Sequence, residues 1–511
     1  MAPGSAAEGR GPNEMSMLAS IETHARERPD HPAIIFEGTS CSYRQLVDRY
    51  RRMSRYFRHL GLGEGCRVCI LSRNRPEYFF IYFATLDCGG TFFPINHELT
   101  GREVEYIVER ASPHLIVIDD TALQSRSSLI EALGNAETCV ISLSELMAAE
   151  RSLPGEGVDE GGETERQPGS IALVVHTSGT TSNAKGVIAT DRMEVASAKA
   201  LREYWCMSPK DISLCALPLS YTFGLFTASY APLSAGATVL LLDRFHPATV
   251  LEQIEKHRAT MMVGVPTMFA MMANIVREKG VRYDTRSMRF FAASGAPVPE
   301  QTRKDFYEFL GHRLLDYYAL SECTPIFSFD LRRADLGAKL SGGLVDGARV
   351  KIVDETGRPV ENGEAGALFV ASERLTPGYY KDAERTSQAI RNGWFETGDL
   401  AWQSDDGYYS IVGRTRDQII SGGHKIATVE IENILLQHPD VVASAVKGEP
   451  DALLGEIAAA FVVLAPTAET NDEQLLAFCR ERLAPYKIPR KIVFRTSLPM
   501  SPAGKVLKRE L

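Results

Sequence analysis

The sequence lacks a long unbroken hydrophobic run and any excess of basic residues. Its longest apolar region, Thr260 to Val276, is interrupted by Pro266 and Asn274, and it is shorter than the roughly 20 residues that a transmembrane helix needs. The formal net charge of −9 provides no broad basic surface, so neither nucleic acid nor a membrane is expected as a partner. A small anion could still bind in a locally positive cleft. We expect a soluble protein.

Cysteine is scarce, and no internal repeat is visible. The nine cysteines are odd in number and scattered, which is typical of a reducing compartment, so we expect a cytoplasmic protein. Cys66 and Cys69 form a single CxxC motif, but they border a short apolar stretch typical of a buried strand, and no second pair follows. Residues 1–14 are small, polar and rich in Gly and Pro, lack the apolar core of a signal peptide, and are predicted to be a disordered tail.

From Ser16 onward the sequence alternates helical and strand patterns. Residues 43–60 place apolar side chains at helical spacing, whereas residues 67–72 form a short apolar run typical of a buried strand. This alternation predicts an α/β fold of mainly parallel sheets covered by helices. Because 511 residues are too many for one hydrophobic core, we expect a large N-terminal domain over 15–416 and a small mobile α+β lid domain over 417–511.

The segment His176–Val187, HTSGTTSNAKGV, combines five hydroxyl residues with two glycines and one lysine. A Walker A loop is excluded, because Ala184 stands where its second glycine belongs and Gly186 follows the lysine in place of Ser or Thr. The flanking residues are typical of two strands, so no helix N-terminus is offered to a phosphate. Backbone N–H groups beside glycine, with several hydroxyl donors, could nonetheless surround triphosphate oxygens.

Six motifs, in order, resemble those of the adenylate-forming superfamily of acyl-CoA synthetases, luciferases and peptide synthetase adenylation domains. They are TSGTTSNAKGV, SGAPVP, YALSE, GWFETGDL, GRTRDQIISGGHKIATVEIE and SPAGKVLKREL. The resemblance covers essentially everything after the tail. The chain is most similar to stand-alone acyl- or aryl-CoA ligases. The resemblance implies an AMP-forming ligase, in which a carboxylate attacks the α-phosphate of ATP and pyrophosphate leaves.

The resemblance also implies a role for each residue that matches a motif. The implied ATP-binding residues are Thr177, Ser178, Gly179, Thr180, Thr181, Lys185, Gly295, Ala296, Pro297, Tyr318, Ala319, Ser321, Asp399, Arg414 and Lys505. Among these, Tyr318 is expected to stack on adenine and Asp399 to accept hydrogen bonds from the ribose hydroxyls.

The implied catalytic residues are Thr177, Lys185, Glu322 and Lys505. Glu322 is expected to bind Mg²⁺, since a hard divalent cation prefers carboxylate oxygen. Lys505 is expected to bridge the substrate carboxylate and the α-phosphate. Asp417 falls at the implied hinge, about which the small domain swings between two half-reactions.

Several positions depart from the family pattern. Ser182 and Ala184 replace the usual Gly and Pro of the loop, and Thr428 replaces a usual Pro with no effect that the sequence predicts. Ala319 replaces a glycine and is expected to narrow the acyl pocket. Tyr221 stands where many ligases carry His, and adds a hydroxyl and an aromatic wall.

These departures indicate a small aryl or short acyl carboxylic acid as the substrate. No Asp stands in residues 220–223 to pair with an α-ammonium group, so an α-amino acid is disfavoured. The predicted pocket residues are Tyr221, Phe223, Gly224, Met268 and Ala319, although each is equally common in an ordinary core.

The acceptor is expected to be CoA, because IISGGHKI resembles the acyl-CoA ligases. Two alternatives stay open: loading of a separate carrier protein, and transfer of an activated acid or another oxyanion, such as nitrite, to an amine. A binding protein that has lost its chemistry is disfavoured, since Glu322, Asp399, Arg414 and Lys505 are all present.

Overall fold

The computed structural model describes residues 16–121, 138–152, 166–177, 184–333, 342–421, 424–451, 453–466, 468–501 and 506–511. The chain divides into two compact units. Unit 1 is Met1–Thr177, Asn183–Arg244 and Thr376–Lys381, and unit 2 is Ser178–Ser182, Phe245–Leu375 and Asp382–Leu511. The predicted tail, 1–14, lies outside the described residues, and the predicted lid, 417–511, belongs to unit 2.

Unit 1 contains two sheets with helices packed on them. The first sheet has the order β6-β5-β3-β4-β7-β8, and its strands are parallel except for the β7–β8 hairpin. The second has the order β9-β10-β1-β2 and is parallel except for β1–β2. The strands are β1 (Pro32–Phe36), β2 (Thr39–Ser42), β3 (Arg67–Ser72), β4 (Thr91–Asn96), β5 (Leu115–Ile118), β6 (Cys139–Ser142), β7 (Ile171–Thr177), β8 (Lys185–Thr190), β9 (Ile212–Cys215) and β10 (Thr238–Leu241).

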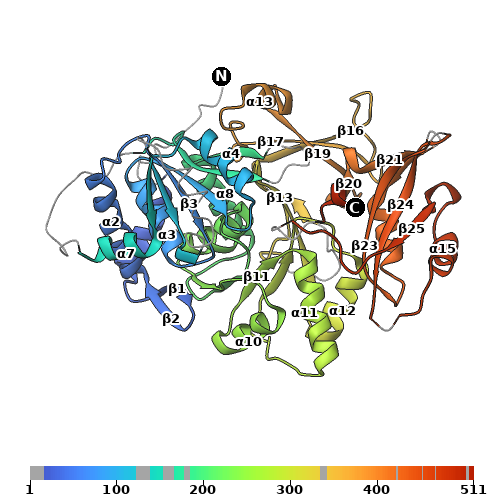
Figure 1. Ribbon diagram of the computed structural model, residues 1–511, viewed down its shortest axis with the longest axis horizontal. Coiled ribbons are helices and arrows are strands. Elements are labelled where there is room, and N and C mark those ends of the chain that lie inside the picture. Colours follow the sequence, from blue (N-terminus) through green and yellow to red (C-terminus); the bar gives the residue numbers. More distant parts are fainter. Residues whose placement is uncertain are drawn as a thin grey trace, which may run out of the picture. The chain divides into compact units, whose positions relative to one another are not determined.

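The helices of unit 1 follow the strands along the chain. They are α1 (Met17–Glu27), α2 (Tyr43–His59), α3 (Glu77–Asp87), α4 (Gly101–Ala111), α7 (Leu143–Ser152), α8 (Asp191–Tyr204), the π-helix η2 (Phe223–Tyr230) and α9 (Ala231–Ser234). Figure 1 shows α2 beside α3 and α7, and the contacts between these helices agree. The predicted strand–helix alternation in this part of the chain is confirmed.

Helix α2 shows why these segments adopt their structure. It begins at Ser42, whose hydroxyl accepts from the Gln45 N–H while the Gln45 side chain accepts from the Ser42 N–H. Such a cap stabilises a helix by about 1 kcal/mol. The predicted apolar stripe, which includes Leu46, Tyr50 and Phe57, is buried. The strand and helix periods of the sequence therefore set which side chains enter the core.

Unit 2 begins with parallel strands and continues with antiparallel ones. Strands β11 (Met261–Gly264), β12 (Phe290–Ala293) and β13 (Leu314–Leu320) are parallel, and the connecting helices α11 (Pro266–Lys279) and α12 (Glu300–Leu310) run side by side in Figure 1. Helix α10 (Pro247–His257) precedes β11. This arrangement agrees with the predicted α/β texture.

From β13 onward every pairing of the larger sheet in unit 2 is antiparallel among the described residues, in the order β13-β14-β15-β20-β19-β17-β16. The sequence prediction did not include this stretch. The physical reason is short turns, such as Ser321–Glu322, which join neighbouring strands directly. The elements are β14 (Cys323–Ser328), β15 (Gly342–Leu344), β16 (Ala348–Val353), β17 (Gly366–Ser372), α13 (Ala383–Ala389), β18 (Ile390–Arg391), β19 (Trp394–Gln403), β20 (Tyr408–Arg414) and the 3₁₀ turn η3 (Thr415–Asp417).

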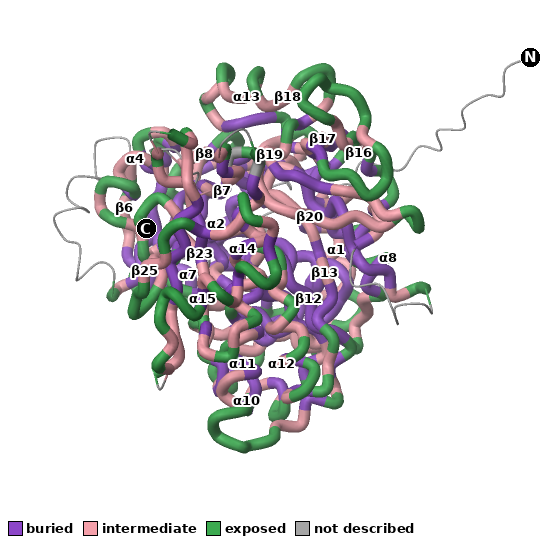
Figure 2. The backbone as a smooth tube through the Cα atoms, turned by 90° about the vertical axis from the view of Figure 1, so that its right-hand side faces the viewer, coloured by how far each residue is buried: buried purple, intermediate pink, exposed green. Residues whose placement is uncertain are grey.

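The burial pattern separates the outer and inner elements of this antiparallel part. Helix α13 has no buried residue, whereas β14 is buried along its whole length. Figure 2 shows α13 and β18 as exposed or half-buried and β12 as buried, whereas β13 passes from buried to half-buried along its length.

The last 94 residues of unit 2 contain a sheet and helices with their own core. The elements are β21 (Gln418–Ser421), β22 (His424–Ala427), α14 (Thr428–Leu435), β23 (Val441–Asp451), β24 (Gly455–Leu464), α15 (Asp472–Arg480), η4 (Pro485–Lys487), β25 (Lys491–Phe494) and η5 (Lys508–Glu510). Ile419, Ile431, Val446 and Leu475 belong to one buried cluster here. This α+β content agrees with the predicted lid, whose boundary stays a prediction. In the part of the chain that the structure describes, no helix is long and apolar enough to span a membrane.

Candidate functional site

Three neighbouring parallel strands of unit 2 bring predicted site residues to one sheet edge. Met268 follows β11, Gly295 follows β12, and Tyr318 lies near the end of β13. The strand register pairs Ala293 with Asp316, so Gly295 lies level with Tyr318. Ligands of α/β proteins bind at this carboxyl edge. The segment Gly295–Pro297 follows β12 after Ser294, with Gly295 at φ +88°, and its place on the adenine side stays a prediction.

Tyr318, Asp399 and Arg414 form one hydrogen-bonded cluster, which we call the ribose cluster. The Tyr318 hydroxyl donates to Asp399 Oδ2 at 2.6 Å, and Arg414 Nε donates to Asp399 Oδ1 at 3.1 Å. Asp399 and Arg414 are direct partners across β19 and β20. Three predicted residues from separate motifs are thus assembled by the fold.

The ribose cluster keeps acceptor capacity for a ligand. Only 4% of Asp399 is exposed, and a carboxylate offers about four lone-pair sites, of which these two contacts occupy one on each oxygen. Burial, and then the Asp399 carboxylate, raise the pKa of Tyr318 well above its usual value, so its hydroxyl stays a donor. One face of the Tyr318 ring stacks on Phe327, with ring centroids 5.4 Å apart.

The turn between β13 and β14 carries Ser321 and Glu322, directly after Ala319 and Leu320. All of these side chains are half-buried. Among the described residues no group of three or more His, Cys, Asp or Glu side chains is arranged to hold a metal ion. Mg²⁺ bound to a nucleotide commonly takes one or two carboxylates plus phosphate oxygens and water, so a single carboxylate at Glu322 fits that kind of site.

The β7–β8 hairpin holds the two ends of the predicted phosphate loop. Thr177 and Lys185 are cross-strand partners, and the predicted residues Ser178, Gly179, Thr180 and Thr181 between them lie outside the described residues. The Lys185 ammonium lies 5.0 Å from the centroid of the Tyr379 ring, within the range of a cation–π contact.

Residues on either side of the hairpin explain its composition. A Cβ on Gly186 would lie 3.0 Å from Val174 Cγ1 and 3.2 Å from the His176 ring, so a side chain at this position would require these neighbours to shift by a few tenths of an ångström. Burial, and then the Arg110 guanidinium, lower the pKa of His176 to about 4. His176 is therefore neutral at physiological pH, and Lys185 is the cationic side chain of the described hairpin ends.

In unit 1 the predicted pocket residues Tyr221, Phe223 and Gly224 lie around the start of the π-helix η2, a rare element that is frequent at functional sites. The Tyr221 hydroxyl accepts from Asn96 Nδ2 at 3.3 Å, and burial raises its pKa to about 12. A Cβ on Gly224 would lie 2.3 Å from the Pro218 carbonyl oxygen, so Gly224 is required by packing.

Two predicted functional residues stand near or within segments that the structure does not describe. Asp417 ends η3, directly after β20, whereas Lys505 lies outside the described residues. The chain after Lys505 is tied to the lid, because Lys508 Nζ lies 2.7 Å from Glu432 Oε1 and donates to Thr428 Oγ1 at 2.8 Å. This contact gives the Thr428 departure a structural role that the sequence did not reveal.

Sequence reasoning also missed Asn74, Asn96 and Tyr78, which surround the loop that carries Tyr221. Asn74 and Asn96 are buried polar residues at or just beyond the ends of β3 and β4. A polar residue at the carboxyl end of a buried parallel strand is the signal that could have found them.

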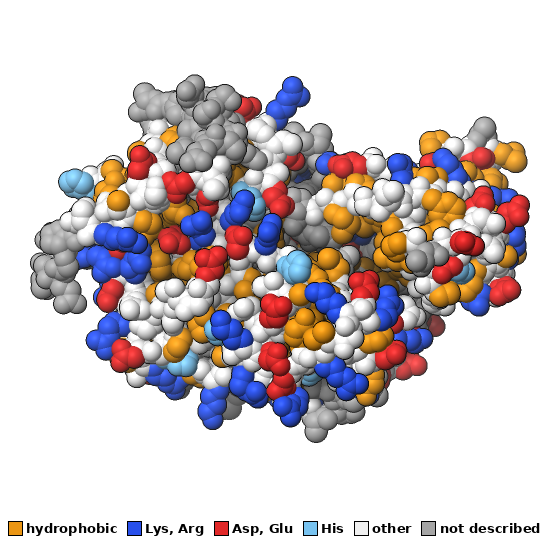
Figure 3. Space-filling model, turned by 60° about the horizontal axis from the view of Figure 1, so that its bottom comes forward, with side chains coloured by type: hydrophobic (Ala, Val, Ile, Leu, Met, Phe, Trp, Pro, Cys, Tyr) orange, Lys and Arg blue, Asp and Glu red, His pale blue; other side chains and the backbone are white. Residues whose placement is uncertain are grey.

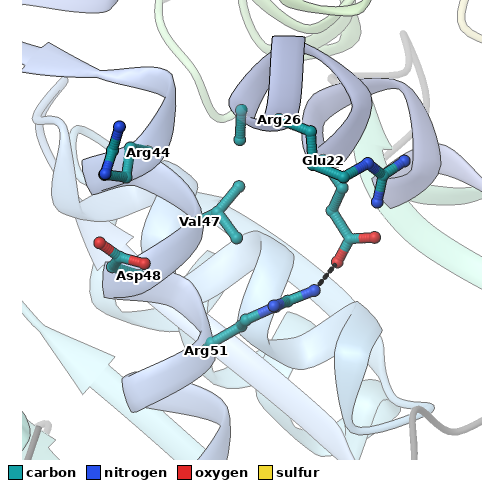
Figure 4. Close-up of a pocket in the computed structure, with 7 residues that line it drawn as sticks. Glu22, Arg26, Arg44, Val47, Asp48 and Arg51 are labelled. Atoms are coloured by element: carbon teal, nitrogen blue, oxygen red, sulfur yellow. Dashed lines mark hydrogen bonds and ion pairs between the residues drawn. The ribbon is translucent and has the colours of Figure 1, made fainter. Parts of the chain in front are cut away.

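Two surface pockets contain none of the predicted site residues. Figure 4 shows one of about 190 Å³ between α1 and α2, where Arg51 and Glu22 pair at 2.7 Å. The other, of about 580 Å³, lies against β1, β2 and α2. On the face shown in Figure 3, Lys and Arg side chains are interspersed with Asp and Glu. We therefore take the sheet-edge residues, and neither of these two pockets, as the candidate site.

Cysteine chemistry does not contribute to the site. None of the nine cysteines forms a disulfide. Burial raises the pKa of Cys66 to about 12 and raises that of Cys69 as well. Thiols of this kind are poor nucleophiles and metal ligands, so the CxxC motif is part of the core.

Comparison with known proteins identifies the class of the chain. It matches the AMP-binding enzyme family over residues 21–380 and the AMP-binding enzyme C-terminal domain over residues 430–505. A feruloyl-CoA synthase from an Amycolatopsis species is 31% identical over 492 residues, which are 95% of this chain and 96% of that protein. A sulfoacetate–CoA ligase from Cupriavidus necator is 30% identical over 505 residues, 97% of each chain.

A solved structure agrees with these relatives. The crystal structure of ATP-bound MatB from Rhodopseudomonas palustris superimposes with a TM-score of 0.88 at 29% identity and covers 97% of this chain and 98% of that one. The predicted α/β fold, the adenylate-forming resemblance and the AMP-forming ligase class are confirmed. The chain belongs to the AMP-binding enzyme family.

Proposed function

We propose that this enzyme converts a small aryl or short acyl carboxylic acid into an acyl-adenylate and then into a CoA thioester. A carboxylate oxygen attacks the α-phosphorus of ATP, and pyrophosphate leaves. The CoA sulfur then attacks the acyl carbon, and AMP leaves. The observation that carries the proposal is the ribose cluster, in which Tyr318, near the end of β13, and Arg414 of β20 both donate to the buried carboxylate of Asp399 on the antiparallel strand β19.

Each residue has a definite task in this proposal. Asp399 accepts hydrogen bonds from the ribose, and Tyr318 lies against the base. Lys185 and the loop after Thr177 bind the β- and γ-phosphates. Lys505 stabilises the charge that develops between the carboxylate and the α-phosphate. Mg²⁺, held by Glu322 together with the phosphates, would offset the charge on the leaving pyrophosphate.

The substrate size follows from the side chains around the acid. Ala319 adds a methyl group where the family commonly has none, and Met268 is buried after β11. Tyr221 adds an aromatic wall with a hydroxyl. The relatives of this enzyme include a feruloyl-CoA synthase and a sulfoacetate–CoA ligase, and both names describe small acids. The nine cysteines, none of which forms a disulfide, support a reducing, cytoplasmic setting.

The test is acid-dependent pyrophosphate release with ATP and Mg²⁺, across aryl, short aliphatic and amino acids and nitrite, each with and without CoA. Products are identified by mass spectrometry. An acyl-CoA from a small carboxylic acid supports the proposal. Pyrophosphate release without a thioester would indicate that the acyl acceptor is a carrier protein or an amine instead of CoA. Release with nitrite alone would overturn the carboxylate assignment.

A further inference from the structure

The loop before η2 is held in place by Asn74, which lies two residues beyond β3. Its Nδ2 donates to the carbonyl oxygens of Leu217 at 2.9 Å and Leu242 at 3.0 Å. Its Oδ1 accepts from the Leu219 N–H at 2.8 Å. Only 5% of Asn74 is exposed. Both amide donors and the amide oxygen are therefore used, and the backbone that leads to Tyr221 is fixed.

Asn96 determines the direction of the Tyr221 hydroxyl proton. Asn96 Oδ1 accepts from the Glu98 N–H at 2.7 Å, which orients the amide, and Nδ2 then donates to Tyr221 Oη at 3.3 Å. An amide nitrogen can only donate. The Tyr221 oxygen is thus the acceptor in this contact, and its own O–H is left to donate to another group.

A second phenol beside Tyr221 also lacks an acceptor. Tyr78, in the first turn of α3, is 1% exposed, and within the described part of the chain its hydroxyl has no hydrogen-bond partner. Burial, and then the neighbouring Tyr221 phenol, raise its pKa. A buried hydroxyl without a partner costs about 1–3 kcal/mol. Unit 1 therefore contains a second hydroxyl, that of Tyr78, whose proton has no acceptor among the described residues.

The local charges restrict the kind of acceptor that fits. After burial, the Glu98 and Glu103 carboxylates contribute to raising the pKa of Tyr221. An anionic group beside Tyr221 would be repelled by the same carboxylates and would lose its hydration. A neutral oxygen acceptor avoids both costs.

We infer that the acid carries a neutral hydrogen-bond acceptor, such as an ether, keto or nitro oxygen, that receives the hydroxyl protons of Tyr221 and Tyr78. Asn96 is the positioning residue that directs the Tyr221 proton to this acceptor. The inference rests on the proposed acid-binding role of Tyr221, and it deepens that proposal by naming a substituent of the substrate.

The experiment uses pairs of benzoic and cinnamic acids that carry either a methoxy or an ethyl group at the same ring position. The two groups are similar in size, but only methoxy has an acceptor. With the full-length enzyme we expect kcat/KM for pyrophosphate release to favour methoxy by about 10-fold or more at one ring position, as one hydrogen bond of ordinary strength gives. Tyr221→Phe and Tyr78→Phe should reduce this preference to about 3-fold or less.

Asn96→Asp tests the positioning role with Tyr221 intact. An ionised Asp accepts from the Glu98 N–H and also from the Tyr221 O–H, which turns the proton away from the ligand. The methoxy preference should fall as in Tyr221→Phe. Tyr82→Phe is the matched control, because Tyr82 lies one turn further along α3 and donates to Met17 Sδ at 3.6 Å. It should retain the preference. If Asn96→Asp does not fold, the methoxy preference of Tyr221→Phe alone tests the inference.

The outcomes separate this inference from the proposed function. Absence of pyrophosphate release with every acid would remove the proposed function. Release with equal kcat/KM for methoxy and ethyl partners at every ring position would overturn the inference and leave the function standing. A methoxy preference that survives in both Tyr221→Phe and Tyr78→Phe would also overturn it.

Discussion

The ribose cluster of unit 2 and the cluster of Asn74, Asn96 and Tyr78 in unit 1, which we call the acid-side cluster, are built from different chemistry. In the ribose cluster a carboxylate and a guanidinium meet at 3.1 Å, and 38% of the Arg414 side chain is exposed. In the acid-side cluster Asn74, Asn96 and Tyr78 are neutral, and each is at most 5% exposed. The buried Asp399 carboxylate is thus paired with a guanidinium that reaches solvent, whereas the buried side chains of the second cluster are all neutral.

The difference follows from the cost of desolvation. A buried charge needs a close partner and further hydrogen bonds, whereas a buried amide needs only its hydrogen bonds. A nucleotide is charged, so it forms stronger hydrogen bonds with ionised side chains than with neutral ones. A small acid whose surface is largely apolar binds best in a pocket that is mostly apolar and has a few oriented hydrogen-bond donors. The two clusters predict different responses to the loss of a single group.

The largest effect on activity is expected from the loss of a charged group, Lys505, at the predicted nucleotide site. Lys505→Ala should lower kcat for adenylation by about 10²–10³-fold, the range for loss of one group that stabilises transition-state charge. ATP binding should survive, because the ribose cluster is intact. Pre-steady-state pyrophosphate release and nucleotide binding measure the two effects. The control is Lys491→Ala, since Lys491 pairs with Glu449 on the lid surface. Equal losses of binding and turnover would contradict the assigned role.

A smaller effect is expected for Asp399→Asn, which keeps the shape and removes the charge. The KM for ATP should rise by about 10–100-fold, because a hydrogen bond to a charged group contributes about 1.5–3 kcal/mol. The KM for the acid should change little. The comparison between the two clusters fails if the acid KM rises as much as the ATP KM.

The third prediction extends the comparison to the core of unit 1. Glu194 on α8 is 2% exposed, and burial, and then the Asp191 carboxylate, raise its pKa to about 8. Its stabilising contribution is complete below about pH 4.5, the unfolded value, and is lost as the pH rises through 8. Unfolding free energy should fall with a slope approaching about 1.4 kcal/mol per pH unit in this window.

Glu194→Gln should remove this slope and make the protein more stable than the wild type at pH 9. Denaturant unfolding at pH 5, 7 and 9 measures the effect. Glu203→Gln, at an exposed position of the same helix, serves as the control. A wild-type slope that persists in Glu194→Gln would show that another group titrates.

The smallest effect is expected in the lid. Thr428→Val removes the hydroxyl that accepts from Lys508, and should destabilise the lid by about 1 kcal/mol, the typical net contribution of one hydrogen bond. Hydrogen exchange should rise in α14 and in residues 506–511. Thr428→Ser keeps the hydroxyl and should restore protection. Raised exchange in Thr428→Ser with wild-type protection in Thr428→Val would indicate that the methyl group, rather than the hydroxyl, matters.

Regular segments of the fold could be predicted from the sequence, because their side-chain periods carry the signal. The stripe of α2 and the apolar run of β3 are such cases. The antiparallel strands between 314 and 414 were missed, since short half-buried strands have weak periodicity and their pairing depends on turns. One such turn, Asp406–Gly407, has Gly407 at φ +84°.

The motif residues of the site could be predicted by resemblance, whereas their supporting residues could not. Asn96 contacts Tyr221 across 125 residues of sequence, and Asn74 contacts Leu219 across 145. Thr428 meets Lys508 across 80 residues. No local pattern connects such positions, because the contact exists only after the sheets have formed.

The close approach of Pro218 to Gly224 limits how the enzyme can acquire new substrates. With 2.3 Å between the carbonyl oxygen and any added Cβ, position 224 admits no side chain without a shift of the backbone that Asn74 holds. Under the proposed acid-binding role of Tyr221, a change of substrate is therefore expected to come through residue 221 rather than through residue 224. A mutant library aimed at a larger or more polar acid gains nothing from varying residue 224 and should vary the proposed substrate residues Tyr221, Met268 and Ala319 instead.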